Sequence, residues 1–416
     1  MRIAENPKAY AIVGITKHGA ELARRLAARM PDTDLYLSEK FLQPGEAQKV
    51  YSFPTNVRLL LEQAFHRYEG WILLISLGAV VRMIAPVLRD KKTDPAVVVV
   101  DDKAQFAISV LSGHLGGANA LTERVAEILG ATPVVTTASD VSGTIAVDLL
   151  GREFGWQLDD DRHVTPASAA VVNEEPVAVI QETGEPGWWR RKSPIPPQIQ
   201  VVRSLEEARA VRPQGFNAVL WITDRLLAEP ELAIAPYRVI YRPKSIVVGL
   251  GCNRGTSLEE IENVVFATLD QQRLSWKSVA CIATISLKKD EAGLLALSEK
   301  FGWPLVAYEP DQLNTVPIPN PSETVFKFTG AYGVSEPAAL LAAGTDQLLL
   351  EKVASGNVTI ALARVDFAQK LGAATSDGAR GEDNANGFWH GEGQGNGTAT
   401  SRKPGVSASV ETEVTT

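Results

Sequence analysis

Apolar runs of strand length alternate with amphipathic stretches over the first 150 residues of the chain. Residues 10–15, 71–76 and 96–100 form such runs, and the almost unbroken valine of the last one is typical of a strand buried on both faces. The stretches 20–29 and 118–129 have the apolar spacing of helices with one buried face. This alternation predicts a mostly parallel sheet covered by helices.

The chain after residue 243 repeats this organisation. Apolar runs at 246–250, 279–285 and 304–308 predict strands, and helix-like stretches lie between them at 258–269 and 290–301. We therefore expect a second mostly parallel sheet that helices cover.

Residues 151–243 contain fewer clear elements. Strand-like runs at 176–181 and 218–223 flank a loop at 184–197 that is rich in Pro, Trp and basic residues. The fold class is therefore predicted to be α/β, in a chain of three parts. The predicted domains are an N-terminal α/β domain over 1–150, a smaller middle domain over 151–243 and a C-terminal α/β domain over 244–367.

The last segment, residues 368–416, differs from the rest in composition. It is rich in Gly, Ser, Thr, Ala, Asn and Glu, and it has little apolar periodicity. Such a segment cannot bury enough apolar surface to offset the entropy lost on ordering, so we predict that this tail is disordered.

The overall composition is that of a soluble globular protein, with 45% hydrophobic and 22% charged residues. A net charge of −8 argues against broad binding to nucleic acids or anionic membranes, because both require a basic face. The two cysteines, Cys252 and Cys281, define no disulfide framework. The first ten residues lack an apolar signal core and the apolar runs are too short to cross a bilayer, so we expect a cytoplasmic protein.

Segment 112–119 combines three glycines with His114 between a predicted strand and a predicted helix. Glycine lets backbone amides approach a ligand closely, and an imidazole can give or take a proton near neutral pH. Asn119 could cap the helix or hydrogen-bond a ligand. The alternative is a tight structural turn in which His114 only donates a hydrogen bond to a carbonyl group.

Segment 80–95 concentrates positive charge in an otherwise acidic protein, with Arg82, Arg89, Lys91 and Lys92. Such side chains suit the carboxylates of a ligand, which Arg can bind in bidentate geometry. The alternative is an ordinary solvated loop surface.

Polar residues also follow the predicted strand at 133–136. Thr136, Thr137 and Asp140 could face the same crevice as the glycine loop, because open α/β sheets bind ligands at the carboxyl ends of their strands. The alternative is a simple helix cap, for which Ser and Asp are common residues.

The remaining motifs give weaker signals. The loop 249–257 has the spacing G-x-G-x-x-x-G rather than G-x-G-x-x-G, so we interpret it as an anion-binding or structural turn and not as a dinucleotide site. Cys252 has no nearby histidine that would activate it as a nucleophile. The five histidines lack metal-ligand spacing, so no protein-bound metal is expected.

Four ordered blocks in the N-terminal part resemble the cobalt-precorrin-5A hydrolases, the CbiG family. These blocks are 81–86, 90–97, 111–119 and 135–140. Their order and their spread over about 60 residues make the resemblance specific.

The C-terminal part resembles the third domain of the same family, which is similar to a small stand-alone protein of the aerobic cobalamin pathway. The similar blocks are 249–257, 282–291 and 334–340. Ser286 departs from the pattern, which has Asp there, and Pro337 replaces a small residue.

The resemblance implies an enzyme of anaerobic cobalamin (vitamin B12) biosynthesis, a hydrolase that acts on a carbon–carbon bond. Its expected substrate, cobalt-precorrin-5A, carries its own cobalt, so no cofactor is expected. In this family water opens the δ-lactone between the ring A acetate and a methylated meso carbon, and that carbon leaves with its methyl group as acetaldehyde, giving cobalt-precorrin-5B. Methyltransferases of the pathway are possible further partners. The alternative is a non-catalytic corrinoid-binding or carrier protein.

Residue roles follow from the chemistry of lactone opening, which needs a positioned water, a base and donors for the developing oxyanion. We expect amides of residues 113–117 to be these donors, His114 to move the proton, and Asp140 to orient His114 or act as the base. The predicted substrate-binding residues are Arg82, Lys91, Lys92, Ser112, Gly113, Gly116, Gly117, Asn119, Thr136 and Thr137.

Overall fold

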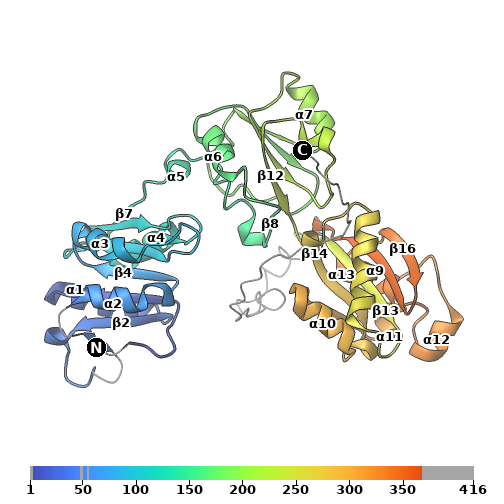
Figure 1. Ribbon diagram of the computed structural model, residues 1–416, viewed down its shortest axis with the longest axis horizontal. Coiled ribbons are helices and arrows are strands. Elements are labelled where there is room, and N and C mark those ends of the chain that lie inside the picture. Colours follow the sequence, from blue (N-terminus) through green and yellow to red (C-terminus); the bar gives the residue numbers. More distant parts are fainter. Residues whose placement is uncertain (1–2, 47–49, 54–55, 368–416) are drawn as a thin grey trace, which may run out of the picture. The chain divides into compact units, whose positions relative to one another are not determined.

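The computed structural model describes residues 3–46, 50–53 and 56–367. Within these residues the chain forms three sheets with helices packed against them, which confirms the predicted α/β class (Figure 1). The tail that we predicted to be disordered, residues 368–416, lies outside the described residues. Among the described helices, none has both the length and the apolar character needed to cross a membrane.

The first sheet has the strand order β3-β2-β1-β4-β5-β6-β7 (blue to cyan in Figure 1). Its strands are β1 (Tyr10–Gly14), β2 (Thr33–Ser38), β3 (Tyr51–Phe53), β4 (Gly70–Leu74), β5 (Ala96–Val100), β6 (Phe106–Leu111) and β7 (Thr132–Val134). All neighbouring pairs are parallel except β5 and β6, which are antiparallel.

Alternate residues of these strands enter separate hydrophobic cores on the two faces of the sheet. Ile12 and Val98 pack in one core with α1 (Lys17–Arg29) and α4 (Ala118–Leu129). Val13 and Val97 pack in the other core with α2 (Val57–Ala64) and α3 (Leu77–Ile84). Burial on both faces is the physical reason why β5 consists almost entirely of valine.

The antiparallel pairing of β5 and β6 determines which loops meet. Asp101 closes the turn between them, because its carboxylate accepts hydrogen bonds from the backbone N–H groups of Lys103 at 2.9 Å and Phe106 at 2.6 Å. In the resulting register Val97, near the start of β5, pairs with Leu111 at the end of β6. The cationic segment before β5 and the glycine loop after β6 therefore lie at the same edge of the sheet.

The second sheet has the strand order β10-β9-β11-β12-β8. Its elements are β8 (Gln157–Leu158), α6 (Val164–Val172), β9 (Val177–Gln181), β10 (Ile199–Val202), α7 (Leu205–Val211), β11 (Ala218–Ile222), α8 (Glu229–Leu232) and β12 (Tyr237–Arg242). The apolar runs predicted β9 and β11, which are largely buried, whereas β8 and β10, with two and four residues, are too short to be recognised.

The third sheet has the strand order β15-β14-β13-β17-β16. Its strands are β13 (Ile246–Cys252), β14 (Val279–Ile285), β15 (Leu305–Tyr308), β16 (Leu348–Ser355) and β17 (Val358–Arg364). The helices of this part are α9 (Leu258–Gln271), α10 (Ala292–Phe301), α11 (Pro310–Leu313), α12 (Glu323–Thr329) and α13 (Ser335–Ala343). Strand β16 had no sequence signal because most of its residues are exposed or half-buried at the sheet edge.

Candidate functional site

The glycine loop between β6 and α4 is a tight turn that requires small residues at particular positions. Ser112 and Gly117 both have left-handed backbone conformations, with φ of 57° and 81°. A Cβ atom on Gly116 would lie 2.4 Å from Cβ of Ser112, so no side chain fits there. The amide of Gly117 donates to the carbonyl of His114 at 2.9 Å, and the amide of Ala118 donates to the carbonyl of Ser112 at 3.1 Å.

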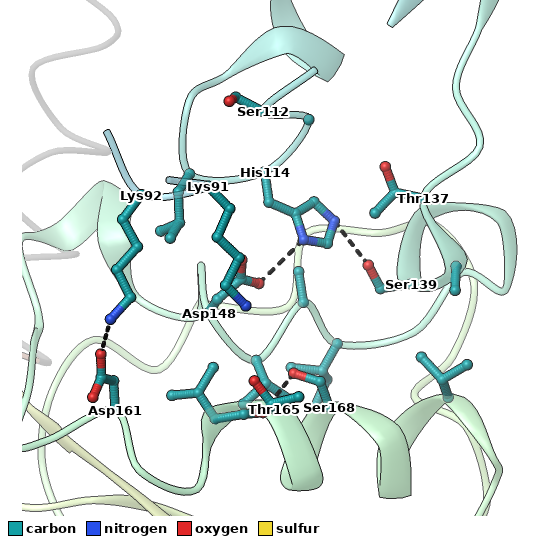
Figure 2. Close-up of a pocket in the computed structure, with 18 of the residues that line it drawn as sticks. Lys91, Lys92, Ser112, His114, Thr137, Ser139, Asp148, Asp161, Thr165 and Ser168 are labelled. Carbon is teal, nitrogen blue, oxygen red and sulfur yellow. Dashed lines mark hydrogen bonds and ion pairs between the residues drawn. The ribbon is translucent and has the colours of Figure 1, made fainter. Parts of the chain in front are cut away.

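The turn places the His114 side chain among three polar groups, of which Figure 2 shows Asp148 and Ser139. Its Nδ1 atom lies 3.2 Å from Oδ1 of Asp148. Its Nε2 atom lies 2.9 Å from Oγ of Ser139 and 3.3 Å from Oδ2 of Asp140. Both ring nitrogens therefore have partners, and the predicted pairing of His114 with Asp140 is present together with a second carboxylate.

The two carboxylates change the acid–base behaviour of His114. The hydrogen bond to Asp148 is the main cause that raises the pKa of His114 above its ordinary value of 6.5, while burial of the half-buried ring opposes the shift and Asp140 adds to it. An imidazole with a raised pKa holds its proton more firmly and is a stronger base when neutral.

A side-chain network fixes Asp140 beside the histidine. Asn119 donates through Nδ2 to Oδ2 of Asp140 at 2.7 Å and to Oγ1 of Thr137 at 2.8 Å. Arg191, from the Trp- and Arg-rich loop of the second part, donates through Nη2 to Oδ1 of Asp140 at 3.2 Å. A Cβ on Gly113 would lie 2.7 Å from Oδ1 of Asn119, so glycine at this position leaves room for the network.

These residues border a cavity of about 830 Å³, which we call the histidine cavity. Its wall combines the glycine loop, the cationic segment before β5, the segment around Asp148 and helix α6 (Figure 2). Lys91 and Lys92 contribute its cationic side, and the ammonium group of Lys92 pairs with the carboxylate of Asp161. Apolar side chains complete the lining, namely Leu115, Ile145, Val147, Leu158, Val164 and Val172.

Two smaller cavities that the described residues form also include His114. One, of about 720 Å³, is lined by Trp188 and Trp189 and by three arginines, which are Arg152, Arg190 and Arg191. The other, of about 430 Å³, is lined by Gly117, Asn119, Asp140 and Arg191 among others. His114, together with Ile145 and Ala146, thus lines both the lysine-lined histidine cavity and the arginine-lined cavity.

The structure brings most of the predicted site residues together. Those that line the histidine cavity are Lys91, Lys92, Ser112, Gly113, His114 and Thr137, while Gly117, Asn119 and Asp140 line the cavity of 430 Å³. Gly116 lies within the turn, where its lack of a side chain allows the close approach of Ser112. Arg82 and Thr136 are exposed and line neither the histidine cavity nor the two smaller cavities that include His114. The guanidinium group of Arg82 donates instead to the carbonyl of Gly78 on its own helix, at 3.0 Å.

Sequence reasoning missed Asp148 and the position of Ser139 beside His114. Asp148 is the single charged residue in the apolar stretch 144–151, which is a signal that the sequence does contain. From the sequence, Ser139 was interpreted only as a helix cap, and nothing in its local sequence indicates the contact with His114. Arg191 and helix α6 also come from a part of the chain whose proximity no local pattern reveals.

The second glycine loop, 249–257, is occupied by groups of the protein itself. The amide of Gly255 donates to Oε1 of the buried Glu291 at 2.6 Å, and Arg254 donates to Asp290 at 3.1 Å. A Cβ on Gly249 would lie 1.9 Å from the carbonyl oxygen of Ser335, so close packing requires this glycine. Burial raises the pKa of the Cys252 thiol, which disfavours a nucleophilic thiolate. These contacts favour the structural interpretation of the loop.

Within the described ranges, no group of three or more His, Cys, Asp or Glu side chains is arranged to hold a metal ion. The two residues that depart from the family pattern in the third part have local explanations. The hydroxyl of Ser286 donates to Oε2 of Glu309 at 2.7 Å, and Pro337 stands in the first turn of α13, where a missing amide hydrogen is tolerated.

The amino-acid sequence matches three family models in consecutive stretches. They are Cobalamin synthesis G N-terminal over residues 59–140, Cobalamin biosynthesis central region over 145–243 and Cobalamin synthesis G C-terminus over 246–363. Similar proteins include one named cobalt-precorrin-5A hydrolase from Priestia megaterium, which is 53% identical over 359 residues, or 86% of this chain and 95% of that relative.

Two further similarities extend this comparison. A protein of the same name from Salmonella typhimurium is 34% identical over 362 residues, which cover 86% of this chain and 97% of that relative. A protein named CobE from Sinorhizobium sp is 34% identical over 121 residues, which cover 28% of this chain and 79% of that protein.

Proposed function

The chain belongs to the cobalt-precorrin-5A hydrolase family, as its sequence blocks predicted, and we propose that it hydrolyses cobalt-precorrin-5A to cobalt-precorrin-5B and acetaldehyde at the histidine cavity. The main support for placing the reaction at this cavity is the position of His114. Its two ring nitrogens contact carboxylates at the wall of a cavity of about 830 Å³. Pockets of roughly 300–1,000 Å³ are the usual size for small-molecule ligands.

The lining of the histidine cavity suits a macrocycle with several carboxylate side chains. Lys91 and Lys92 supply positive charge on one side, and apolar residues such as Ile145 and Val164 supply surface for the flat, apolar part of the ring system. Lys92 is paired with Asp161, so a substrate carboxylate would compete with Asp161 for the ammonium group. The substrate carries its own cobalt, and the proposal requires no metal or cofactor of the protein.

Opening a lactone requires a group that takes the proton from the attacking oxygen and donors that stabilise the oxyanion. His114 is the proton acceptor in this proposal, because its neutral form is a strong base that the two neighbouring carboxylates stabilise after protonation. The loop amides of residues 113–116 are the candidate oxyanion donors, since the amide of Gly117 already donates within the turn.

Replacing His114 by Ala tests the proposal. We expect loss of acetaldehyde release with cobalt-precorrin-5A, while substrate binding, followed by the change in its visible spectrum, is retained. His18→Ala is the matched control, because His18 is exposed on α1 far along the chain from the site. Normal acetaldehyde release from a folded His114→Ala protein would remove His114 from the mechanism.

The same experiment separates hydrolysis from the alternative of a corrinoid carrier, which would bind the substrate without releasing acetaldehyde. The names of the two full-length relatives favour the hydrolase. Transfer of the product to pathway methyltransferases and a cytoplasmic location belong to the same proposal, and co-purification and fractionation of cells would test them.

A further inference from the structure

The geometry around His114 points to Ser139 as the nucleophile of the hydrolysis. His114 is the base that accepts the proton of Ser139, and Asp148 is the carboxylate that orients His114. We infer that the lactone opens through a covalent ester between Ser139 and the ring A acetate, rather than by direct attack of water. This inference rests on the proposed function, because it assigns the first step of that reaction.

The three side chains follow the order of a nucleophile, a base and an orienting carboxylate (Figure 2). Oγ of Ser139 lies 2.9 Å from Nε2 of His114, and Nδ1 of the same ring lies 3.2 Å from Oδ1 of Asp148. In the tautomer in which Nδ1 carries the proton and donates a hydrogen bond to Asp148, Nε2 is free to accept the proton of Ser139. Serine hydrolases on unrelated folds use this connectivity, which is recognised by geometry and not by sequence order.

Ser139 is held in place and still borders the substrate space. It is only 5% exposed, yet it lines the histidine cavity together with His114 and Asp148. Its carbonyl accepts a hydrogen bond from the amide of Thr144 at 3.0 Å, and the amide of Asp140 donates to the carbonyl of Thr137 at 3.0 Å. These bonds fix the backbone on both sides of the hydroxyl group, so that little ordering is required when the substrate binds.

Asp140 is the competing partner of Nε2, at 3.3 Å. Its carboxylate also accepts hydrogen bonds from Asn119 at 2.7 Å and from Arg191 at 3.2 Å, and the guanidinium group offsets its charge. Asp148 is therefore the carboxylate that acts mainly on His114, and Nε2 remains directed to the shorter contact with Ser139. In this arrangement Asp140 is a positioning residue held by its own network.

The chemical step balances with one molecule of water. The hydroxyl proton of Ser139 passes to Nε2 of His114 as Oγ bonds to the lactone carbonyl carbon. The ring C–O bond then breaks, and the leaving oxygen on the meso carbon takes the proton from Nε2. Water attacks the resulting ester with His114 again as base, the acetate leaves as a carboxylate, and Ser139 recovers its proton.

A serine-directed reagent tests the nucleophile without the natural substrate. Diisopropyl fluorophosphate forms a bond from phosphorus to an activated serine oxygen as fluoride leaves and the proton passes to the base. We expect the full-length protein to gain one adduct on Ser139, located by peptide mass spectrometry, and His114→Ala to lose it. Ser142→Ala is the matched control, because Ser142 is exposed three residues away, and it should be labelled as the wild type is.

Turnover of cobalt-precorrin-5A tests the ester itself. Acid quenching during turnover should reveal a substrate adduct on the peptide that contains Ser139, and Ser139→Ala should lower kcat by ~100-fold or more with binding retained. Absence of both adducts, or a Ser139→Ala protein with kcat within about tenfold of the wild type, would overturn the inference in favour of direct water attack. Failure of the wild type to release any acetaldehyde would instead contradict the proposed function, whereas the labelling result does not depend on that reaction.

Discussion

The Nδ1 atom of His114 and the Oδ1 atom of Asp148 lie 3.2 Å apart, although they belong to segments that follow different strands of the first sheet. His114 stands in the turn between β6 and α4, and Asp148 stands in the segment that leads from the first sheet to the second. This contact dominates the upward shift of the pKa of His114. It therefore links the structure of the site to the pH dependence of its reaction.

Replacing Asp148 by Asn should move the acidic limb of the kcat/KM profile to lower pH. His114 acts as a base only when neutral, and the loss of the Asp148 charge lowers the pKa of His114 toward its ordinary value of 6.5. The maximal kcat should fall as well, since Asn no longer stabilises the protonated ring. Steady-state kinetics of acetaldehyde release across the neutral pH range would measure both effects, and an unchanged limb would contradict the role of Asp148.

The same variant should lose stability mainly at acidic pH. Because the pKa of His114 is raised in the folded state, its stabilising contribution is complete below the unfolded value near 6.5 and disappears as pH rises through the folded value. The difference in free energy of unfolding between wild type and Asp148→Asn should therefore shrink as the solution becomes alkaline. Urea denaturation at several pH values would measure this trend.

Replacing Arg191 by Ala should move the acidic limb of the kcat/KM profile to higher pH. The guanidinium group now offsets the charge of Asp140, and its loss leaves a stronger negative field 3.3 Å from Nε2 of His114. The pKa of His114 then rises further, and the neutral base appears only at higher pH. Arg203→Ala is a suitable control, because Arg203 is exposed and lines neither the histidine cavity nor the two smaller cavities that include His114. A shift of the limb to lower pH would contradict the proposed arrangement.

Replacing Lys91 by Ala should raise KM and leave kcat nearly unchanged. Lys91 lines the histidine cavity and, among the described residues, forms no hydrogen bond or ion pair with the three groups around His114, so it can hold a substrate carboxylate without taking part in the chemical step. The loss of one charge-assisted hydrogen bond predicts an increase in KM of about tenfold. Lys103→Ala, in the exposed turn between β5 and β6, provides the control for a lost surface charge. A fall in kcat as large as the change expected in KM would instead indicate that Lys91 takes part in the chemical step.

Replacing Gly116 by Ala should destabilise the protein, because the new Cβ would lie 2.4 Å from Cβ of Ser112 in a turn without room to move. Overpacking of this kind typically costs about 1–3 kcal/mol. Gly78→Ala, in helix α3, is the counterpart, since its Cβ meets only the end of the flexible Arg82 side chain at 3.5 Å. That change should stabilise the protein by up to ~1 kcal/mol, as measured by thermal or urea unfolding.

The strands with continuous apolar runs were predictable from the sequence. Strand β5 is an example, because a strand buried on both faces needs an unbroken apolar run, and such a run is visible without knowledge of its neighbours. Strands β8 and β16 were not predictable, since one is very short and the other largely exposed at a sheet edge. For such strands, pairing with a neighbour provides the stabilisation, and local sequence does not record it.

The candidate site was predictable in its parts but only partly in its assembly. The glycine turn with His114 and the lysines of the cationic segment each have a local signature, but a uniformly parallel sheet would have placed the end of β6 and the start of β5 at opposite edges. The hairpin that Asp101 closes brings them together. Arg82 belongs to the same cationic segment as the lysines, yet its side chain donates a hydrogen bond to the carbonyl of Gly78 on its own helix.

By itself, the sequence determined the family, the α/β class and the residue types available for acid–base chemistry and for binding carboxylates. These properties depend on short patterns of apolarity, glycine and charge, which act over a few neighbouring residues. Only the tertiary structure decided that Ser139 and Asp148 contact the two nitrogens of one imidazole and that helix α6 lines the cavity. Contacts between residues distant in the chain arise from the packing of whole elements, and no local pattern encodes the distance between two side chains that such packing brings together.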